Sequence, residues 1–467
     1  MQLKHYQGGN HIGILTNFTG KINTFIKKIT FKNSNSSTNC FFTMIEEFKE
    51  IINFKELLQD NVTYEKGSNS TFSVECVLDF IIDCLIKGNT RFLHMEDMRN
   101  DAVYINIKGY ELPSEKVCRD TIDALPKETI NELKRVNQKL LELKSKNQEP
   151  REITLNFDDT VCTVFGEQEG AEKGYNPEYK GRKSFKEKIA IIADTNELIN
   201  TTLEEGSKHS NFEFLEFFKE CEKGLPKNWY IKRIRADRGM FDQENFKYFE
   251  EQSYEYVVKG NMQNNTRKIL EYINKNEEQY EWLELEKSFL AFNEITMALP
   301  TWTKARRMIF IRKKIRNKKL KKGNINYENL YKYEYQVIVT NIDYMTPKEI
   351  FDEYNQRCNV ENNIDELKSG FGISQNSRKI KKNNEILLVL KMIAFNLNRW
   401  FQEQILPEDM KKHEIQTLRR VLYNICGELK GGYYCKYIKF PNYTYLIEAM
   451  KHILSELKCF SNSVRLL

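Results

Sequence analysis

The spacing of apolar residues changes near residue 151, and this change most constrains what the chain can fold into. Up to residue 150 the apolar residues follow helical spacing, as in "STFSVECVLDFIIDCLIKGN", a segment that ends at Gly88. From "EITLNFDDTVCTVFG" onward, β-rich runs alternate with helical runs such as "NFEFLEFFKECEKGL". Strands interleaved with helices are typical of an α/β domain. The sequence therefore predicts an α/β core that follows a helical N-terminal region.

Further changes of pattern divide the 467 residues into five regions. They are a helical N-terminal region (1–150), a first part of the core (151–278), a β-rich insertion (279–340), a second part of the core (341–405) and a helical or mixed C-terminal region (406–467). The insertion is rich in aromatic and β-branched residues without helical spacing, which suggests a separate unit. Around Pro126 the pattern predicts two helices, which form either a helix-turn-helix or a plain helical hairpin.

Positive charge is concentrated in one segment. Between Lys304 and Lys322 there are eleven Lys or Arg residues and no acidic residue, whereas the whole chain has a net charge of only +6. A cationic block in a nearly neutral protein favours a polyanionic partner, above all nucleic acid. The alternative is a Lys-rich and Asn-rich composition that reflects codon usage, but such a bias explains scattered lysines better than a block.

The remaining composition limits the class of protein. The ten cysteines are scattered without a C-x-x-C pair, and the six histidines are equally dispersed, so we expect reduced thiols and no soft-metal site. The segment "MQLKHYQGGN" lacks the apolar core of a signal peptide, and no run approaches the roughly eighteen apolar residues that span a bilayer. We therefore expect a cytoplasmic protein.

Four polar residues of "YNQRCNVENNIDELKSGFG" share one side of a helix that is predicted to begin at residue 347. At about 100° per residue, the four lie within roughly 60° of one another: Tyr354, Arg357, Glu361 and Lys368. Apolar residues fall on the adjoining arc, so this polar stripe follows the rim of the buried face. A carboxylate held there could still meet a ligand. The stripe indicates either a binding site or an ordinary amphipathic helix.

Two aspartates occur in or at the end of predicted strands. In "EITLNFDDTV", alternation places the apolar residues on one face and Asn156 with Asp158 on the other, which favours Asp158 over Asp159 as a site residue. Asp237 follows the strand "WYIKRIRA" at a turn that contains Gly239, and strand ends often carry site carboxylates. Taken singly, either Asp158 or Asp237 could instead be a turn or capping residue.

With Glu361, these aspartates make three carboxylates without a histidine, a ligand set that suits Mg²⁺ or Mn²⁺ rather than zinc. Two such ions about 4 Å apart would activate a water or a 3′-hydroxyl and stabilise the leaving oxygen in a phosphodiester displacement. The sequence has no glycine-rich phosphate loop of the Walker type, which disfavours nucleotide hydrolysis.

Together these blocks resemble the DDE transposases of bacterial insertion sequences, in the branch with a Tyr-x2-Arg-x3-Glu-x6-Lys signature. "DDTVCTVFGEQEGAEKGYNPEYKGRKSF" and "IRADRGMF" are similar to the two aspartate blocks of the insertion-sequence group numbered thirteen-eighty, as are "VTNID" and "AFNLNRW" on either side of the signature. The similarity extends from "GGNHIG" to "LRRVLYNICGELKGG". The resemblance implies an RNase H-like catalytic core interrupted by the β-rich insertion.

The resemblance also implies roles for individual residues. It makes three carboxylates the catalytic, metal-binding triad: Asp158, Asp237 and Glu361. It places three side chains of the stripe against the phosphates of the transposon end: Tyr354, Arg357 and Lys368. In the insertion it implies DNA contacts by three residues of "LPTWTKARR", with the tryptophan stacked on a base: Trp302, Arg306 and Arg307. The alternative for this tryptophan is a place in the apolar core.

The implied reaction is cut-and-paste DNA transposition. The N-terminal helices and the basic insertion would bind the terminal inverted repeats, a homodimer would pair two ends, and the freed 3′-hydroxyls would join target DNA at the nucleoid. The sequence departs from the family at Asn156, where an aspartate is common, and in "LEEGSKHSN", which matches only loosely. The alternatives are a catalytically inactive DNA-binding descendant and a host nuclease with an RNase H-like fold.

Overall fold

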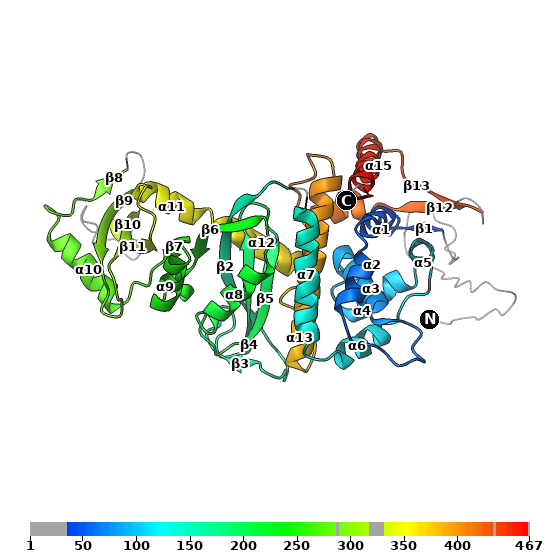
Figure 1. The fold of residues 1–467 in the computed structure, drawn as a ribbon, viewed down its shortest axis with the longest axis horizontal. Helices are drawn as coiled ribbons and strands as arrows, with labels where there is room; N and C mark the ends of the chain where they lie inside the picture. The colour runs from blue at the N-terminus through cyan, green and yellow to red at the C-terminus, as the bar shows by residue number, and fades with distance from the viewer. Residues whose placement is uncertain (1–34, 147, 286–288, 317–330, 433–435, 466–467) are drawn as a thin grey trace, which may run out of the picture.

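The computed structural model describes residues 35–467 apart from 147, 286–288, 317–330, 433–435 and 466–467, and the side chains of 358–361 and 465 also lie outside the description. The molecule is elongated, with a strand-rich end, a central sheet and a helical end (Figure 1). One long helix, α13 (Lys381–Ile405), runs between the sheet and the helical end. Helix α13 packs on α3, α7 and β5 and is buried along most of its length. The apolar residues of α13 therefore pack both on the sheet and on the N-terminal helices.

The described part of the N-terminal region is mainly helical. Its helices are α1 (Phe42–Ile51), α2 (Phe54–Asn61), α3 (Val74–Lys87), α4 (Phe92–Arg99), α5 (Ala102–Lys108), α6 (Glu115–Ala124) and α7 (Thr129–Ser145). Helix α3 ends at Gly88, as predicted, because this residue takes the left-handed conformation that glycine adopts without strain. Helices α6 and α7 are the pair predicted around Pro126. Helix α7 packs on α2, α13 and β5, whereas α6 packs on α3, α4 and α13.

The α/β prediction is confirmed. One sheet has the strand order β5-β4-β2-β6-β7-β11-β10-β9-β8, with the short β3 (Glu172–Lys173) beside β4. The strands are β2 (Arg151–Thr163), β4 (Lys183–Ile192), β5 (Leu198–Glu205), β6 (Trp229–Ala236), β7 (Glu255–Lys259), β8 (Leu283–Glu284), β9 (Leu290–Met297), β10 (Arg306–Arg316) and β11 (Tyr331–Thr340). Strands β2, β6 and β7 are parallel, and the other pairings are antiparallel.

One face of this sheet carries the largest apolar cluster of the strands. Three helices cover this face: α8 (Phe214–Gly224), α9 (Gln243–Glu251) and α10 (Asn264–Lys275). Helix α11 (Pro347–Asn355) packs on β7 and β9, and its Ile350 and Tyr354 belong to a second cluster with Ile309, Ile311 and Ile338. The two clusters lie on opposite faces because neighbouring residues of a strand point in opposite directions.

The expectation of a separate β-rich insertion needs correction. Strands β8 to β11 lie within 279–340 as predicted, but they do not form a sheet of their own. Ile338, Val339 and Thr340 of β11 pair with Lys259, Val258 and Val257 of β7, so the insertion continues the central sheet. The physical reason is that β7 would otherwise be an edge with unpaired backbone groups, and β11 satisfies them.

The single helix predicted from residue 347 also needs correction. Helix α11 ends at Asn355 and α12 (Cys358–Phe371) begins three residues later. At the junction the Arg357 N–H donates to the carbonyl of Tyr354, a tight turn of the 3₁₀ type. The helical spacing that aligned the polar stripe is therefore interrupted between Tyr354 and Glu361, and tertiary contacts of the junction decide which side chains meet.

The C-terminal region contains both helices and strands. It contains α14 (Ile415–Leu418), β12 (Gly427–Gly431), β13 (Lys436–Lys439) and α15 (Thr444–Arg465). Strand β12 pairs with β1 (Ser36–Ser37), and α15 packs on α1, so this region closes over the N-terminal helices. Within the described part of the chain, none of the helices has the length and apolarity needed to cross a bilayer.

Candidate active site at the ends of two parallel strands

Two of the predicted carboxylates occupy adjacent positions on neighbouring strands. Strands β2 and β6 are parallel, and their register pairs Phe157 with Ala236. Asp158 and Asp237 are the next residues on each strand. Asp158 alternates with the buried Phe157, so its side chain points to the face opposite the α8 and α9 helices. The structure therefore brings together two aspartates that are far apart in the sequence.

Asp237 also caps the turn that follows β6. Its Oδ1 accepts a hydrogen bond of 2.6 Å from the Gly239 N–H, and this contact fixes the carboxylate at the strand end. A Cβ atom on Gly239 would lie 2.6 Å from the Ser210 Cβ and 2.9 Å from the Asp237 Oδ1, so only glycine fits. The capping role is thus compatible with a role in a site, because it holds the side chain in place.

Arg357 lies against Asp158. Its Nη2 is 2.7 Å from the Asp158 Oδ1, and the same nitrogen lies 3.5 Å from the Phe157 carbonyl oxygen. The guanidinium is buried, with Arg357 only 7% exposed. A buried cation beside a carboxylate keeps that carboxylate ionised. The N-terminal end of α12 is therefore held directly over the strand that carries Asp158.

The Tyr354 side chain lies near these charged residues. Burial raises the pKa of its hydroxyl to about 12, the charge of Arg357 opposes the rise, and the charges of Asp237 and Asp158 add to it. The hydroxyl is therefore protonated at neutral pH and able to donate a hydrogen bond. The Lys259 ammonium lies 5.9 Å from the centroid of the Tyr354 ring.

The other two residues of the stripe are placed differently. Glu361 lies near the N-terminal end of α12, and its side chain is outside the described residues. Lys368 is exposed two turns further along α12. The structure therefore unites Tyr354 and Arg357 with Asp158 and Asp237, and it leaves the assignment of Glu361 a prediction.

Two arginines that sequence analysis missed hold the helix junction over the strands. Arg233 and Arg235 project from one face of β6 and approach the Glu353 carboxylate to 2.9 and 3.7 Å. Arg235 also donates to the Glu353 carbonyl at 3.0 Å and to the Gln356 side chain at 3.2 Å. Burial lowers the pKa of Arg235. Two arginines at alternate positions of the predicted strand before Asp237 were the available signal, since buried charges need partners.

The neighbouring Asp159 points away from this group, as alternation predicted. Burial raises its pKa to about 7, with a hydrogen bond from Ser210 and the charge of Lys188 opposing the rise. On the face of Asp158, the Asn156 Oδ1 is buried and has no hydrogen-bond partner within the described part of the chain. Two carboxylates and a spare amide oxygen on one face are hard oxygen donors, and they fit Mg²⁺ or Mn²⁺.

One group of three acidic side chains within the described residues is close enough to share a cation, but it lies in the helical end: Glu46, Asp79 and Asp83. Lys49 lies 2.6 Å from Asp79 and 2.7 Å from Asp83, and Lys108 lies 2.6 Å from Glu46. Two buried ammonium groups therefore already supply the positive charge. This cluster links α1, α3 and α5 and is not the predicted metal site.

The three residues of the insertion that are predicted to contact DNA bind other residues of the protein. Trp302 is 8% exposed and packs against Phe241 and Phe246. Arg306 forms two hydrogen bonds with the Glu250 carboxylate, of 2.8 and 3.0 Å. Arg307 binds Glu294 and the Ile342 carbonyl. Contact of these three side chains with DNA would require release of these partners, and it stays a prediction.

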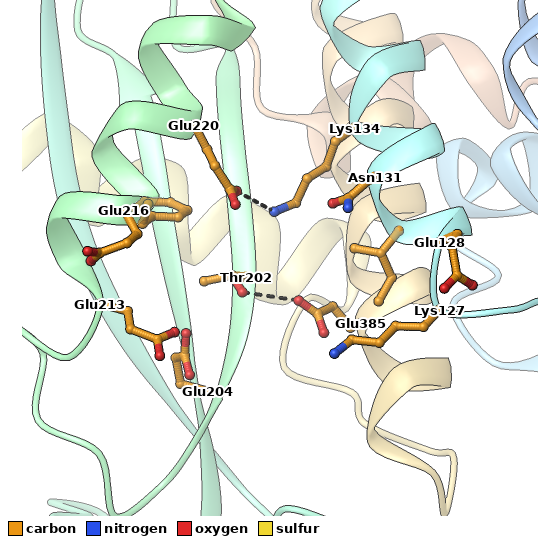
Figure 2. Close-up of a pocket in the computed structure, with 12 residues that line it drawn as sticks. Lys127, Glu128, Asn131, Lys134, Thr202, Glu204, Glu213, Glu216, Glu220 and Glu385 are labelled. Carbon is orange, nitrogen blue, oxygen red and sulfur yellow. Dashed lines mark hydrogen bonds and ion pairs between the residues drawn. The ribbon is translucent and has the colours of Figure 1, made fainter.

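A cavity of about 270 Å³ lies between α7, α8, β5 and the start of α13, and none of the predicted site residues lines it (Figure 2). Six glutamates line it with two lysines: Glu128, Glu204, Glu213, Glu216, Glu220, Glu385, Lys127 and Lys134. Lys134 pairs with Glu220 at 3.0 Å. Because its walls are mainly acidic, this cavity would repel a phosphate backbone.

Comparisons with known proteins now identify the family. The model of the family described as Transposase DDE domain group 1 matches residues 28–462. No curated protein sequence matches this chain. Two solved structures are similar: a piggyBac transposase synaptic complex with hairpin DNA (13% identity, 84% of this chain and 80% of that chain covered, TM-score 0.40) and a Drosophila P element transposase strand transfer complex (11%, 50% and 52%, 0.23). Because the family match spans nearly the whole chain, the protein belongs to the DDE transposases, which are metal-dependent DNA endonucleases and strand transferases.

Proposed function

We propose that this transposase works by cut-and-paste, with Asp158, Asp237 and Glu361 as its metal-binding carboxylates. The observation that carries the proposal is the adjacency of Asp158 and Asp237 on parallel strands, with the N-terminal end of α12 held against them. The strand order β5-β4-β2-β6-β7, antiparallel up to β2 and parallel after it, supports an RNase H-like core. The quoted sequence blocks support membership of the insertion-sequence group numbered thirteen-eighty.

The three carboxylates would hold two divalent cations, Mg²⁺ or Mn²⁺. Such ions activate a water or a 3′-hydroxyl and stabilise the leaving oxygen of a phosphodiester. The protein's own contribution is placement: the turn at Gly239 fixes Asp237, and the ion pair with Arg357 keeps Asp158 charged.

Arg357 and Tyr354 would position the DNA strand. Arg357 now donates to Asp158, and a guanidinium in this place matches a phosphate in a bidentate manner. The protonated Tyr354 hydroxyl would donate a hydrogen bond to a phosphate oxygen. Lys368, exposed further along α12, would supply a point charge to the next part of the strand.

The same proposal assigns regions of the chain. Region 1–150 would bind the inverted repeats, 151–278 and 341–405 would form the catalytic core, 279–340 would contact the transposon end, and 406–467 would close the N-terminal region. Two copies would pair the two ends, and the protein would act at the nucleoid.

The test is cleavage of a supercoiled plasmid that carries the inverted repeats, in Mg²⁺. Asp237→Asn and Glu361→Ala should each lower cleavage at least a thousandfold and leave end binding within about twofold, because the carboxylates act through the metal. Asp352→Asn is the matched control, since Asp352 is an exposed acid of α11 that pairs only with Lys348 among the described residues.

Three outcomes would contradict the proposal. Undiminished cutting by Asp237→Asn or Glu361→Ala would refute the carboxylate assignment. Equal cleavage of a plasmid without inverted repeats would favour a general nuclease. Absence of cleavage by the unmodified protein, with end binding intact, would favour an inactive DNA-binding descendant.

A further inference from the structure

The far end of the β10–β11 ribbon carries cations opposite tyrosines. Residues directly opposite each other on antiparallel strands project from the same face of a sheet. The register of β10 and β11 pairs three cations with three tyrosines on one face: Arg312 with Tyr335, Lys314 with Tyr333 and Arg316 with Tyr331. We call these six side chains the tyrosine–cation ladder.

The side chains of the ladder contact one another. The Arg312 guanidinium lies 5.1 Å from the Tyr333 ring centroid, and the Lys314 ammonium lies 5.0 Å from that of Tyr331. The rings of Tyr333 and Tyr335 are 6.2 Å apart. Tyr331 and Tyr333 nevertheless remain 41% and 43% exposed. The ladder is therefore an ordered array, and two of its three rings, Tyr331 and Tyr333, are open to solvent.

Two of the three cations have no acidic partner within the described chain. Arg312 pairs with Glu277 at 3.4 Å and with Glu284 at 3.2 Å. Lys314 and Arg316 are exposed, and no ion pair is found for either among the described residues. The ladder thus offers a surplus of positive charge beside exposed aromatic rings.

The ladder lies on the sheet face opposite the aspartates. Arg312 follows Phe310 by two residues, and Phe310 packs in the same apolar cluster as Phe157. Asp158 alternates with Phe157 and therefore points to the other face. A DNA strand bound at Asp158 and Asp237 would not reach the ladder from the same side, so the ladder is a second surface.

We infer that the tyrosine–cation ladder is a binding site for single-stranded DNA. Phosphates would meet Lys314 and Arg316, and bases would stack on the exposed tyrosines, as in other proteins that bind single strands through aromatic platforms in basic surroundings. In a duplex the bases already stack on each other and are not available to the rings. This inference goes beyond the cleavage site and does not depend on it.

The test measures binding of a fluorescent oligothymidine to the full chain in EDTA, where cleavage is blocked. Tyr333→Ala should weaken binding about 5- to 150-fold, the loss expected from one stacked base, and Tyr333→Phe should retain it. Lys314→Ala should weaken binding and reduce the slope of log affinity against log salt by about 0.7. Both positions are exposed on the ribbon, and circular dichroism of each variant checks the fold.

The matched control is Lys313→Ala, which removes the same charge from the neighbouring, exposed position on the opposite face of the ribbon. Its affinity should stay within about twofold. Equal losses for Lys313→Ala and Lys314→Ala, full binding by Tyr333→Ala, or equal competition by a duplex of the same length would each overturn the inference. Asp237→Asn separates the two proposals, since it should bind oligothymidine normally whether or not it cleaves.

Discussion

At the scale of single residues, Arg357 contacts Asp158, one of the proposed metal ligands. Its Nη2 lies 2.7 Å from the Asp158 Oδ1, in a buried setting where an unpaired carboxylate would be costly. Without a bound metal ion, the guanidinium therefore balances the negative charge of Asp158. If a divalent ion binds to Asp158, as proposed above, it and the guanidinium compete for the same carboxylate.

This competition predicts the effect of Arg357→Gln. The variant should bind Mn²⁺ more tightly, with a Kd roughly tenfold lower, because a competing charge is removed. It should also cleave DNA more slowly, because a phosphate ligand is lost. Calorimetric titration of the full chain with Mn²⁺ measures the first effect. Arg420→Gln, at an exposed position of the C-terminal region, is the control, and a weaker affinity of Arg357→Gln would contradict the competition.

At the scale of elements, the position of α12 depends on α11. Glu353 at the end of α11 is clamped by Arg233 and Arg235 of β6, and all three side chains are largely buried. The clamp fixes the junction from which α12 starts, and α12 carries Glu361. The geometry of the candidate site is thus set by an ion-pair cluster outside it.

We predict that Glu353→Gln lowers the free energy of unfolding by about 3 kcal/mol, because it leaves the buried Arg235 without a carboxylate and Arg233 with Glu255 alone. Cleavage should fall even at a temperature where the variant is still folded, since α12 loses its anchor. Denaturant unfolding and plasmid cleavage measure the two effects. Asp352→Asn, one residue away on α11 and exposed, should change stability by less than about 0.5 kcal/mol. Equal effects of both variants would refute the clamp.

A buried glutamate of strand β4, Glu187, makes stability depend on pH. Burial raises the pKa of Glu187 to about 7, with the charge of Lys391 opposing the rise. The folded state therefore keeps a proton between the ordinary pKa of 4.5 and about 7, whereas the unfolded state releases it. This group consequently stabilises the fold fully at low pH, and its contribution is lost as the pH rises through about 7.

Glu187→Gln should remove this dependence. Relative to the unmodified chain, the variant should gain about 1 kcal/mol of stability for each pH unit between pH 5 and 7, and the difference should level off above pH 7. Urea unfolding across this range measures the gain. Glu278→Gln, which removes an exposed glutamate, controls for loss of a carboxylate. A constant difference between Glu187→Gln and the unmodified chain would disprove the assignment.

At the scale of the whole molecule, the N-terminal and C-terminal regions share one core. The largest apolar cluster joins residues of α1 to α7 with residues of α13 to α15. Phe48 of α1 stacks on Phe460 of α15 at 5.4 Å and meets Trp400 of α13 edge-on at 5.4 Å. The proposed N-terminal DNA-binding region therefore does not have a core of its own.

A double-mutant cycle tests this shared core. Phe48→Ala and Phe460→Ala should show a coupling of about 0.5–1.5 kcal/mol in the free energy of unfolding, the value for a stacked aromatic pair. Phe48→Ala with Phe165→Ala should be additive, since Phe165 is 69% exposed and contacts Tyr179 and Arg182. Additivity in the first pair would mean that the two regions are energetically separate.

Local spacing in the sequence determined the elements and the face that each residue takes. The alternation around Asp158 predicted that it, and not Asp159, would face a site, and Gly88 and Pro126 predicted helix limits that the structure confirms. These properties depend on residues within one turn or one strand, which contact each other whatever the rest of the chain does.

Tertiary structure alone decided which of these elements meet. The break before α12, the pairing of β11 with β7, the Glu353 clamp and the Arg357–Asp158 contact join segments that are distant in sequence. Periodicity carries no information about such contacts, because they depend on backbone hydrogen bonds and buried charges that find partners only when the chain is folded. The sequence by itself thus determined the candidate residues, and the packing of β2, β6 and α12 decided that Asp158, Asp237 and Arg357 lie together.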